Sequence, residues 1–218
     1  MVVAIDGPAG SGKSTVAKRV AERAGFRYLD TGAMYRTLTF AVLEKEIGLS
    51  DSRAIIAEAL DFDVAFRAER VIYKGRDVTT QIRSPEVDKA ISEVARIPQV
   101  RREMVKLQQR MGEAGDCVVE GRDTTTVVFP QAELKVFLDA DFETRVSRRM
   151  GDFKKQNLEV RRESVRDDLE RRDKADRERS VGPLVQAEDA VYVDTTDLSI
   201  EEVVEKVFKL VQARRMSA

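Results

Sequence analysis

Short runs of apolar residues recur along the chain, and between them apolar residues return every three or four positions. The runs lie at 2–5, 28–29, 117–119, 134–138 and 190–193, and they predict strands, the second of them weakly. The helical pattern predicts amphipathic helices between these strands. Strands separated by helices favour a parallel sheet covered on both faces. The pattern therefore predicts an α/β fold with a parallel central sheet flanked by helices.

Two helices carry signals of their own. After the first strand, apolar residues at helical spacing are Val16, Val20, Ala21 and Ala24. The last helix has a capping box, because Glu202 follows Ser199 by three positions. Its expected buried face consists of Ile200, Val203, Val204, Val207 and Val211.

Two regions depart from this alternation. Apolar and polar positions alternate over 62–66 and 71–73, and a turn follows at 74–77, which predicts a small antiparallel insertion. Residues 145–179 hold 13 Lys or Arg and 9 Asp or Glu, a net charge of +4. Composition favours a solvated helix with ion pairs four positions apart. A mobile arm that closes over polyphosphate is the functional alternative.

The composition of the 218-residue chain is that of a globular protein, with 42% apolar and 35% charged residues. A net charge of −1 produces no field that would attract nucleic acid or a membrane, so we expect neither as a partner. We find no signal-peptide pattern and no apolar stretch long enough for a bilayer, and we expect a cytoplasmic monomer. Cys117 lies in an apolar run and is expected to be a buried thiol. The absence of histidine excludes an imidazole base.

The strongest chemical signal lies at residues 7–14, which fit the pattern G-x-x-x-x-G-K-[ST]. Glycines allow a tight turn whose N–H groups point at phosphate oxygens, and the next helix adds the positive end of its dipole. In this motif Lys13 can reach the β- and γ-phosphates, and Ser14 can hold Mg²⁺. A turn that binds nothing is disfavoured, because the motif follows a strand and opens a helix. The expected ATP-binding residues are Gly7, Pro8, Ala9, Gly10, Ser11, Gly12, Lys13, Ser14 and Thr15.

The loop indicates nucleotide binding but leaves the reaction open. The only asparagine, Asn157, precedes leucine, so the N-K-x-D motif of a GTPase is missing. The loop type and the lack of H-R-D exclude a protein kinase. A small-molecule kinase is favoured, with AMP, UMP or shikimate as alternative acceptors. A P-loop ATPase or a nucleotide-sensing module is the alternative from another class.

Three further motifs make a family recognisable. D-T-G-A-M-Y-R stands at 30–36, G-R-D at 121–123 with T-V-V-F-P at 126–130, and R-D-K-A-D-R-E-R at 172–179. With the phosphate loop, this set resembles bacterial cytidylate kinases over nearly the whole chain. The resemblance implies a single P-loop domain over 1–218 of the nucleoside monophosphate kinase type. It also implies a monophosphate-binding insertion at 61–96 and a helical lid at 151–180.

The same resemblance implies an activity and its residues. The γ-phosphate of ATP would pass to CMP or dCMP, giving ADP and CDP or dCDP, with Mg²⁺ as cofactor, in pyrimidine nucleotide metabolism. Residues around the acceptor's α-phosphate would be Thr31, Tyr35, Arg36, Arg122 and Arg179. Its sugar would contact Arg172 and Asp176, and its cytosine edge would contact Ser92, Arg101 and Asp123. The catalytic residues would be Lys13, Arg122, Arg179 and Arg177, the last near the transferred phosphoryl group.

Structural alternatives accompany these roles. Tyr35 could be a core aromatic residue and Asp30 a helix cap, and the charges of residues 172–179 could be surface pairs. One departure from the family pattern is Thr125, because a glycine usually stands two residues after the aspartate of G-R-D. We therefore expect a stiffer turn after Asp123.

A phosphate acceptor suits a chain without histidine. The second pKa of a phosphate monoester is ~6, so the attacking oxygen is already ionised at neutral pH and needs no general base. Catalysis then depends on positioning and positive charge, which arginine supplies through its planar fork.

Overall fold

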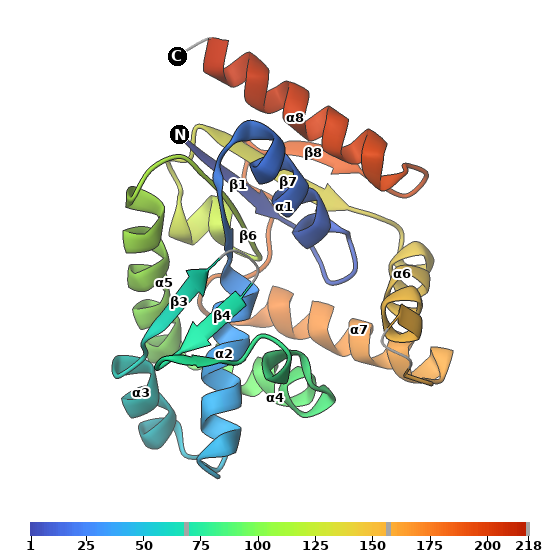
Figure 1. Ribbon diagram of the computed structural model, residues 1–218. Coiled ribbons are helices and arrows are strands. Elements are labelled where there is room, and N and C mark those ends of the chain that lie inside the picture. The colour runs from blue at the N-terminus through green and yellow to red at the C-terminus, as the bar shows by residue number, and fades with distance from the viewer. Residues whose placement is uncertain (68–69, 156–157, 217–218) are drawn as a thin grey trace. The chain divides into compact units, whose positions relative to one another are not determined.

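The computed structural model describes residues 1–67, 70–155 and 158–216, which form two compact units (Figure 1). The first unit comprises Met1–Leu29 and Met111–Ala218, and the second comprises Asp30–Arg110. Each unit has a buried apolar interior of its own, with Ile5 and Leu138 in the first and Leu38 and Ile82 in the second.

A five-stranded sheet forms the centre of the first unit, in the order β2-β6-β1-β7-β8. Its central strand β1 pairs in parallel with β6 and β7, and β7 pairs in parallel with β8. The predicted strands and the predicted parallel sheet are thus confirmed. The strand bounds are Val2–Asp6 for β1, Arg27–Asp30 for β2, Cys117–Gly121 for β6, Leu134–Asp139 for β7 and Val191–Asp194 for β8.

Helices α1 (Lys13–Ala24) and α8 (Ile200–Met216) lie together over one face of this sheet, as Figure 1 shows. Their apolar stripes bury Val16, Val20, Val203 and Val207 against the side chains of the sheet. Burying such side chains is the main favourable term in folding. The predicted capping box of α8 is also present, because the carboxylate of Glu202 accepts from the N–H and the hydroxyl of Ser199.

Helices α6 (Phe142–Lys155) and α7 (Arg162–Glu178) form the charged region. They pack through an apolar cluster that contains Val146, Val165 and Leu169 and also includes Ala9 of the phosphate loop. Composition alone favoured a solvated helix, which is true of only one face of α7. The other face is packed into the first unit, and this packing fixes the side chains that the helix carries.

In the second unit the predicted antiparallel insertion is confirmed as a three-stranded sheet, β3-β4-β5, with Val64 opposite Tyr73. Four helices not singled out from the sequence accompany it. On α4 (Pro85–Ala95) the buried residues Val87, Ala90 and Val94 recur at helical spacing, so the periodic signal was present in the sequence but was not used. The bounds are Thr31–Glu44 for α2, Ser52–Leu60 for α3, Val64–Arg67 for β3, Arg70–Tyr73 for β4, Arg76–Asp77 for β5, Gln81–Arg83 for η1, Pro85–Ala95 for α4 and Pro98–Glu113 for α5.

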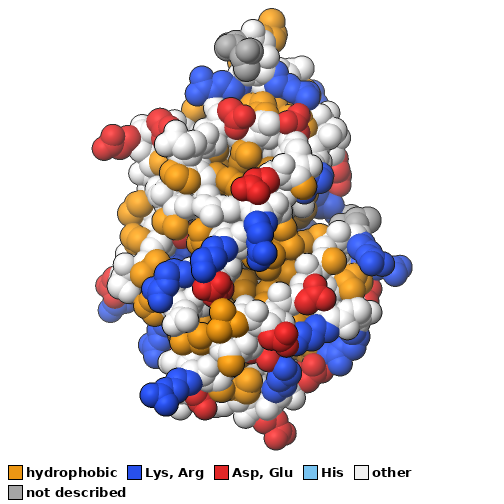
Figure 2. Space-filling model, turned by 90° about the vertical axis from the view of Figure 1, so that its left-hand side faces the viewer, with side chains coloured by type: hydrophobic (Ala, Val, Ile, Leu, Met, Phe, Trp, Pro, Cys, Tyr) orange, Lys and Arg blue, Asp and Glu red, His pale blue; other side chains and the backbone are white. Residues whose placement is uncertain are grey.

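The surface carries charges of both signs. In Figure 2, basic and acidic side chains are interspersed with apolar ones on the visible face. Within the residues that the structure describes, no helix has the length and apolar character needed to cross a membrane.

Leu138 on β7 is fully buried, so we expect Leu138→Ala to lower the free energy of unfolding by about 2–5 kcal/mol, since it leaves a cavity in the sheet's core. Denaturant titration followed by circular dichroism measures this loss. Leu158→Ala in the same unit is the matched control, because Leu158 is 40% exposed and its truncation should cost much less. Equal losses would contradict the burial assigned to β7.

Candidate active site

The phosphate loop connects β1 to α1, and two of its glycines are required by geometry. A Cβ on Gly7 would lie 2.0 Å from the carbonyl oxygen of Leu138, so only glycine lets the loop pass this close to β7. Gly12 caps α1 with φ of 88°, a left-handed conformation that other residues rarely adopt. The loop therefore has the turn that directs successive N–H groups toward a bound anion.

The outward carbonyl groups of this loop are held by cationic side chains. Lys13 Nζ donates to the carbonyl of Pro8 at 3.1 Å, and Arg145 donates to that of Ala9 at 3.1 Å. Arg148 donates to the carbonyl of Ser11 at 3.4 Å. Each bond fixes one carbonyl group, so these three side chains hold the conformation of the loop.

Lys13 is 5% exposed, although its side chain ends in an ammonium group. Burial lowers its pKa to about 8, and repulsion from the guanidinium of Arg122 contributes to the same direction. The carboxylates of Glu120, Asp176 and Asp6 oppose this shift but do not cancel it, because burial is its main cause. Such a site stabilises a ligand with several negative charges.

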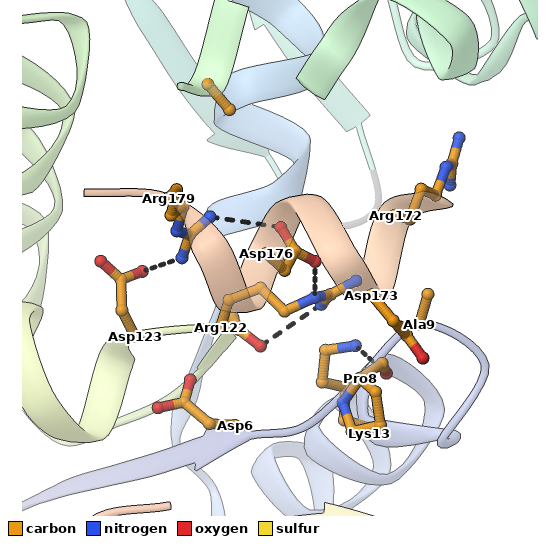
Figure 3. A network of polar contacts seen from close by, with 12 residues as sticks. Asp6, Pro8, Ala9, Lys13, Arg122, Asp123, Arg172, Asp173, Asp176 and Arg179 are labelled. Atoms are coloured by element: carbon orange, nitrogen blue, oxygen red, sulfur yellow. Dashed lines mark hydrogen bonds and ion pairs between the residues drawn. The ribbon is translucent and has the colours of Figure 1, made fainter. Parts of the chain in front are cut away.

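A network of ion pairs near this lysine connects the segment after β6 to α7 (Figure 3). Arg122 follows β6, and its Nε donates to Asp176 Oδ2 at 2.7 Å. Arg179, at the end of α7, lies 3.3 Å from Asp176 Oδ1 and 3.5 Å from Asp123 Oδ1. One carboxylate thus holds two arginines, and the network brings together four of the predicted site residues.

Asp176 is ionised within this network. Burial alone would raise the pKa of its carboxyl group, but the guanidinium of Arg122, aided by that of Arg179, outweighs burial and lowers the pKa. The interpretation of residues 172–179 as surface pairs is wrong for Asp176 and Arg179, because they also pair with Arg122 and Asp123 in the segment after β6. Their spacing alone could not reveal those partners.

Arg145 was missed by sequence reasoning. It is 5% exposed on α6 and pairs with Asp173 of α7 at 2.5 Å while it holds the Ala9 carbonyl. Asp173 in turn is 5% exposed. This pair ties the phosphate loop to α7, and no local pattern signals it, since one arginine among many in a charged helix looks ordinary.

Glu120, the penultimate residue of β6, was also missed. It is 3% exposed, and its Oε1 accepts from the hydroxyl of Ser14 at 2.7 Å and from that of Tyr28 at 3.3 Å. An acidic residue at the carboxyl end of an apolar strand beside the phosphate-loop strand was the available signal. Within the described ranges, no group of three or more acidic or cysteine side chains could hold a metal by itself. A serine hydroxyl and one carboxylate suit Mg²⁺, which keeps several waters and binds substrate phosphates.

The segment after Asp123 forms a five-residue π-helical turn, η2 (Thr124–Val128). Thr124 and Thr125 donate their backbone N–H and hydroxyl groups to the carboxylate of Asp6 on β1. The departure from the family's glycine at position 125 thus gives a hydroxyl with a defined partner. The expected stiffness of the turn itself stays a prediction.

The remaining acceptor-binding predictions fall in the second unit, on α2, α4 and α5. Arg101 is 2% exposed and its guanidinium lies 5.3 Å from the ring centroid of Tyr35, which is itself buried. Arg36 forms an ion pair with Asp88. The structure also bears on the two structural alternatives. Tyr35 is a buried aromatic residue, as one of them has it. The side chain of Asp30 caps α2 by accepting from the N–H of Ala33 at 2.8 Å, as the other has it. Thr31 is buried at the start of α2, and Ser92 lies on α4.

Two predicted residues lie apart from the network on α7. Arg172 pairs with Asp168 one helical turn earlier, at 3.2 Å, and its side chain is only 11% exposed, so the spacing of a surface pair is present but the exposure is not. Arg177 is exposed. Their predicted roles toward the sugar and the transferred phosphoryl group stay predictions.

A phosphate loop between a parallel strand and its helix, with buried cations beside it, defines a P-loop phosphotransferase. The family model for cytidylate kinase matches residues 3–213. A cytidylate kinase of Caldanaerobacter subterraneus subsp. tengcongensis is 45% identical over 210 residues, 96% of this chain and 94% of that protein. The cytidylate kinase of Bacillus subtilis is 44% identical over 216 residues, 97% of this chain and 96% of that protein. The chain belongs to the cytidylate kinase family.

Family membership confirms the prediction of an ATP-dependent nucleoside monophosphate kinase. A solved structure of an uncharacterized protein from Eubacterium ventriosum ATCC 27560 resembles the fold, with a TM-score of 0.56 and 12% identity. The match covers 97% of this chain and 98% of that one. At this identity the likeness concerns the fold alone.

The lowered pKa of Lys13 predicts that ATP binding weakens as the pH rises through about 8. The ammonium form attracts phosphate and the neutral amine does not, so the loss lies above that pH. Fluorescence titration with a labelled ATP between about pH 7 and 9.5 should give a dissociation constant that is flat and then rises. Lys13→Arg is the control, because its guanidinium keeps its proton and its profile should stay flat. A flat profile for the unmodified protein would contradict the shift.

Proposed function

We propose that this chain transfers the γ-phosphate of ATP to CMP or dCMP, giving ADP and CDP or dCDP. The observation that carries the proposal is the ion-pair network of the first unit, in which Asp176 holds Arg122 and Arg179 near Lys13. Membership of the cytidylate kinase family supports the choice of acceptor. The product class places the reaction in pyrimidine nucleotide metabolism.

Positive charge is what the proposed transfer needs most. Negative charge spreads over the equatorial oxygens of the transferred phosphoryl group in a loose transition state. Lys13 is placed in the loop that would bind the β- and γ-phosphates, and Arg122 and Arg179 would bind the acceptor's phosphate. A planar guanidinium can bind a phosphate through two parallel hydrogen bonds, and Asp176 holds both guanidinium groups in position.

No residue has to act as a general base. The acceptor phosphate has a second pKa of ~6 and is largely ionised at neutral pH. Asp176 is ionised but engaged with two guanidinium groups, so it orients cations rather than removing a proton. The chain contains no histidine, which agrees with a reaction that needs no proton acceptor.

Mg²⁺ fits the donor set beside the phosphate loop. We propose that Ser14 would hold the ion directly and that Glu120, which accepts from the serine hydroxyl, would orient that ligand and a bound water. When bound, Mg²⁺ neutralises charge on the β- and γ-phosphate oxygens. The hydroxyl of Tyr28 donates to the same oxygen of Glu120, Oε1, and helps to fix the carboxylate.

Further roles follow from the family resemblance. Thr31, Tyr35 and Arg36 would contact the acceptor's phosphate, and Ser92 and Arg101 would read the cytosine edge together with Asp123. Arg172 and Asp176 would contact the sugar. Residues 61–96 would form the monophosphate-binding insertion and 151–180 a lid that excludes water, which protects ATP from hydrolysis. Residues 68–69 and 156–157 of these segments lie outside the described residues. The monomeric state and the cytoplasmic location stay predictions.

An acceptor panel tests the proposal. ADP release is followed by a coupled assay with ATP and CMP, dCMP, UMP, AMP, shikimate or no acceptor. CMP and dCMP should give the fastest release, and the reaction without acceptor should be slower by roughly a hundredfold or more, because water lacks the binding that positions a nucleotide. Lys13→Ala is prepared in parallel and should lose the activity, which excludes a contaminating kinase. Equal ADP release without an acceptor would show a P-loop ATPase instead.

The metal assignment predicts that Glu120→Gln raises the Mg²⁺ concentration needed for half-maximal rate by about 10–100-fold. Glutamine keeps an oxygen that can accept from Ser14 but loses the charge that orients the cation site. A Mg²⁺ titration at saturating ATP and CMP measures the change. Tyr28→Phe is the control, because it removes the long 3.3 Å bond to Glu120 but keeps the carboxylate, and it should shift the requirement little. An unchanged Mg²⁺ requirement in Glu120→Gln would contradict the proposed role of Glu120 at the metal site.

A further inference from the structure

Asp6, the last residue of β1, has a carboxylate whose two oxygens each accept two hydrogen bonds. Oδ1 accepts from the N–H of Thr124 at 2.9 Å and from its hydroxyl at 2.7 Å. Oδ2 accepts from the N–H of Thr125 at 2.8 Å and from its hydroxyl at 2.6 Å. All three residues are at most 1% exposed. A buried carboxylate with four donors is a rigid junction between the segments that it joins.

The donors belong to the first turn of η2, whose initial N–H groups have no partner within the turn. The residue before a helix ordinarily caps such groups with its own side chain. Asp123 holds that position, yet its side chain makes no capping hydrogen bond. Asp6 supplies the cap from another strand.

Because Asp6 caps η2, the side chain of Asp123 can be directed away from the turn. Its carboxylate lies 3.5 Å from Arg179 instead of folding back on the turn (Figure 3). Arg122 precedes it in the chain and pairs with Asp176. Asp6 also precedes Gly7, the first residue of the phosphate loop. One carboxylate therefore joins the start of the phosphate loop to the segment that carries Arg122 and Asp123.

We propose that Asp6 is a positioning residue for phosphoryl transfer, which caps η2 through Thr124 and Thr125 and so directs Asp123 and Arg122 toward the acceptor nucleotide. This inference rests on the proposed function. Asp6 accepts from the two threonine hydroxyls in addition to the two backbone N–H groups. The second hydroxyl belongs to Thr125, at the position where the family usually has glycine. The junction therefore acts on the acceptor side of the site more than on ATP.

A purely structural role is the competing explanation, because a buried carboxylate needs donors in any fold. Neighbouring threonines separate the two explanations. The hydroxyl of Thr125 donates to Asp6, whereas the buried hydroxyl of Thr126 has no hydrogen-bond partner within the described residues. Replacing either threonine by valine makes the same isosteric change, but only Thr125→Val removes a bond to Asp6.

The experiment compares steady-state kinetics of Thr125→Val, Thr126→Val and Thr125→Ser in the full chain, with the dissociation constant of labelled ATP and the melting temperature measured for each. Thr125→Val should lower kcat/KM for CMP by roughly tenfold or more, since a buried hydrogen bond is lost and its acceptor keeps one donor fewer. Its affinity for labelled ATP should stay near that of the unmodified protein. Thr126→Val should match the unmodified protein, and Thr125→Ser, which keeps the hydroxyl, should restore the rate.

Equal kcat/KM for CMP in Thr125→Val and Thr126→Val would overturn the proposal, even if Thr125→Val melts at a lower temperature. An equal loss of ATP affinity in Thr125→Val would also overturn it, because the effect would then not be on the acceptor side. Should Thr125→Val fail to fold, Thr124→Val removes the other hydroxyl bond and is judged by the same comparison. If the unmodified protein transfers phosphate to no nucleotide, the proposed function fails instead, and that result is visible before any variant is made.

Discussion

The arrangement of positive charge in the first unit depends on the two ion pairs of Asp176. A site that binds phosphates must hold cations close together, and like charges repel strongly where water is excluded. The pKa of Lys13 is lowered mainly by burial, and repulsion from Arg122 adds to this shift. Asp176 offsets the repulsion by accepting from Arg122 while it pairs with Arg179, so that two guanidinium groups share one counter-ion. The remaining charge is available to a ligand.

The phosphate loop imposes a second requirement on the fold. Its N–H groups can face a ligand only if its carbonyl groups face outward, and those carbonyls then need donors of their own. Lys13 and the α6 residues Arg145 and Arg148 supply them. Because Arg145 also pairs with Asp173, the same contacts hold α7 and thus Asp176 in place. The ATP side and the arginine network are therefore mechanically connected within one unit.

The sequence predicted the features that depend on local physics. Strands, the glycine-rich loop and the capping box at Ser199 follow from periodicity and from the residues that a turn or cap requires. Glu120 could have been predicted as a site residue, since the carboxyl ends of parallel strands meet at one edge of the sheet. The partners of Asp176 were not, because Arg122 lies 54 positions away.

Other features could not be predicted because their physical cause is tertiary. From the sequence, Thr125 predicted only a stiffer turn. Its partner Asp6 could not be predicted, because the two residues meet through the pairing of β1 with β6. Arg145 had no distinguishing spacing in a segment with 13 basic residues. The second unit was predicted only in its antiparallel sheet, since no helix was singled out there and the burial of Tyr35 and Arg101 depends on tertiary packing.

The central claim is that Asp176 acts by holding Arg122, so that the two residues form one functional unit. A double-mutant cycle with Asp176→Asn, Arg122→Lys and the double variant, measured as kcat/KM for CMP, tests this most directly. The account predicts strong non-additivity, with a coupling energy above about 1 kcal/mol, because either single change already breaks the pair. Additive losses, with a coupling energy near zero, would contradict it and would mean that the two side chains act independently.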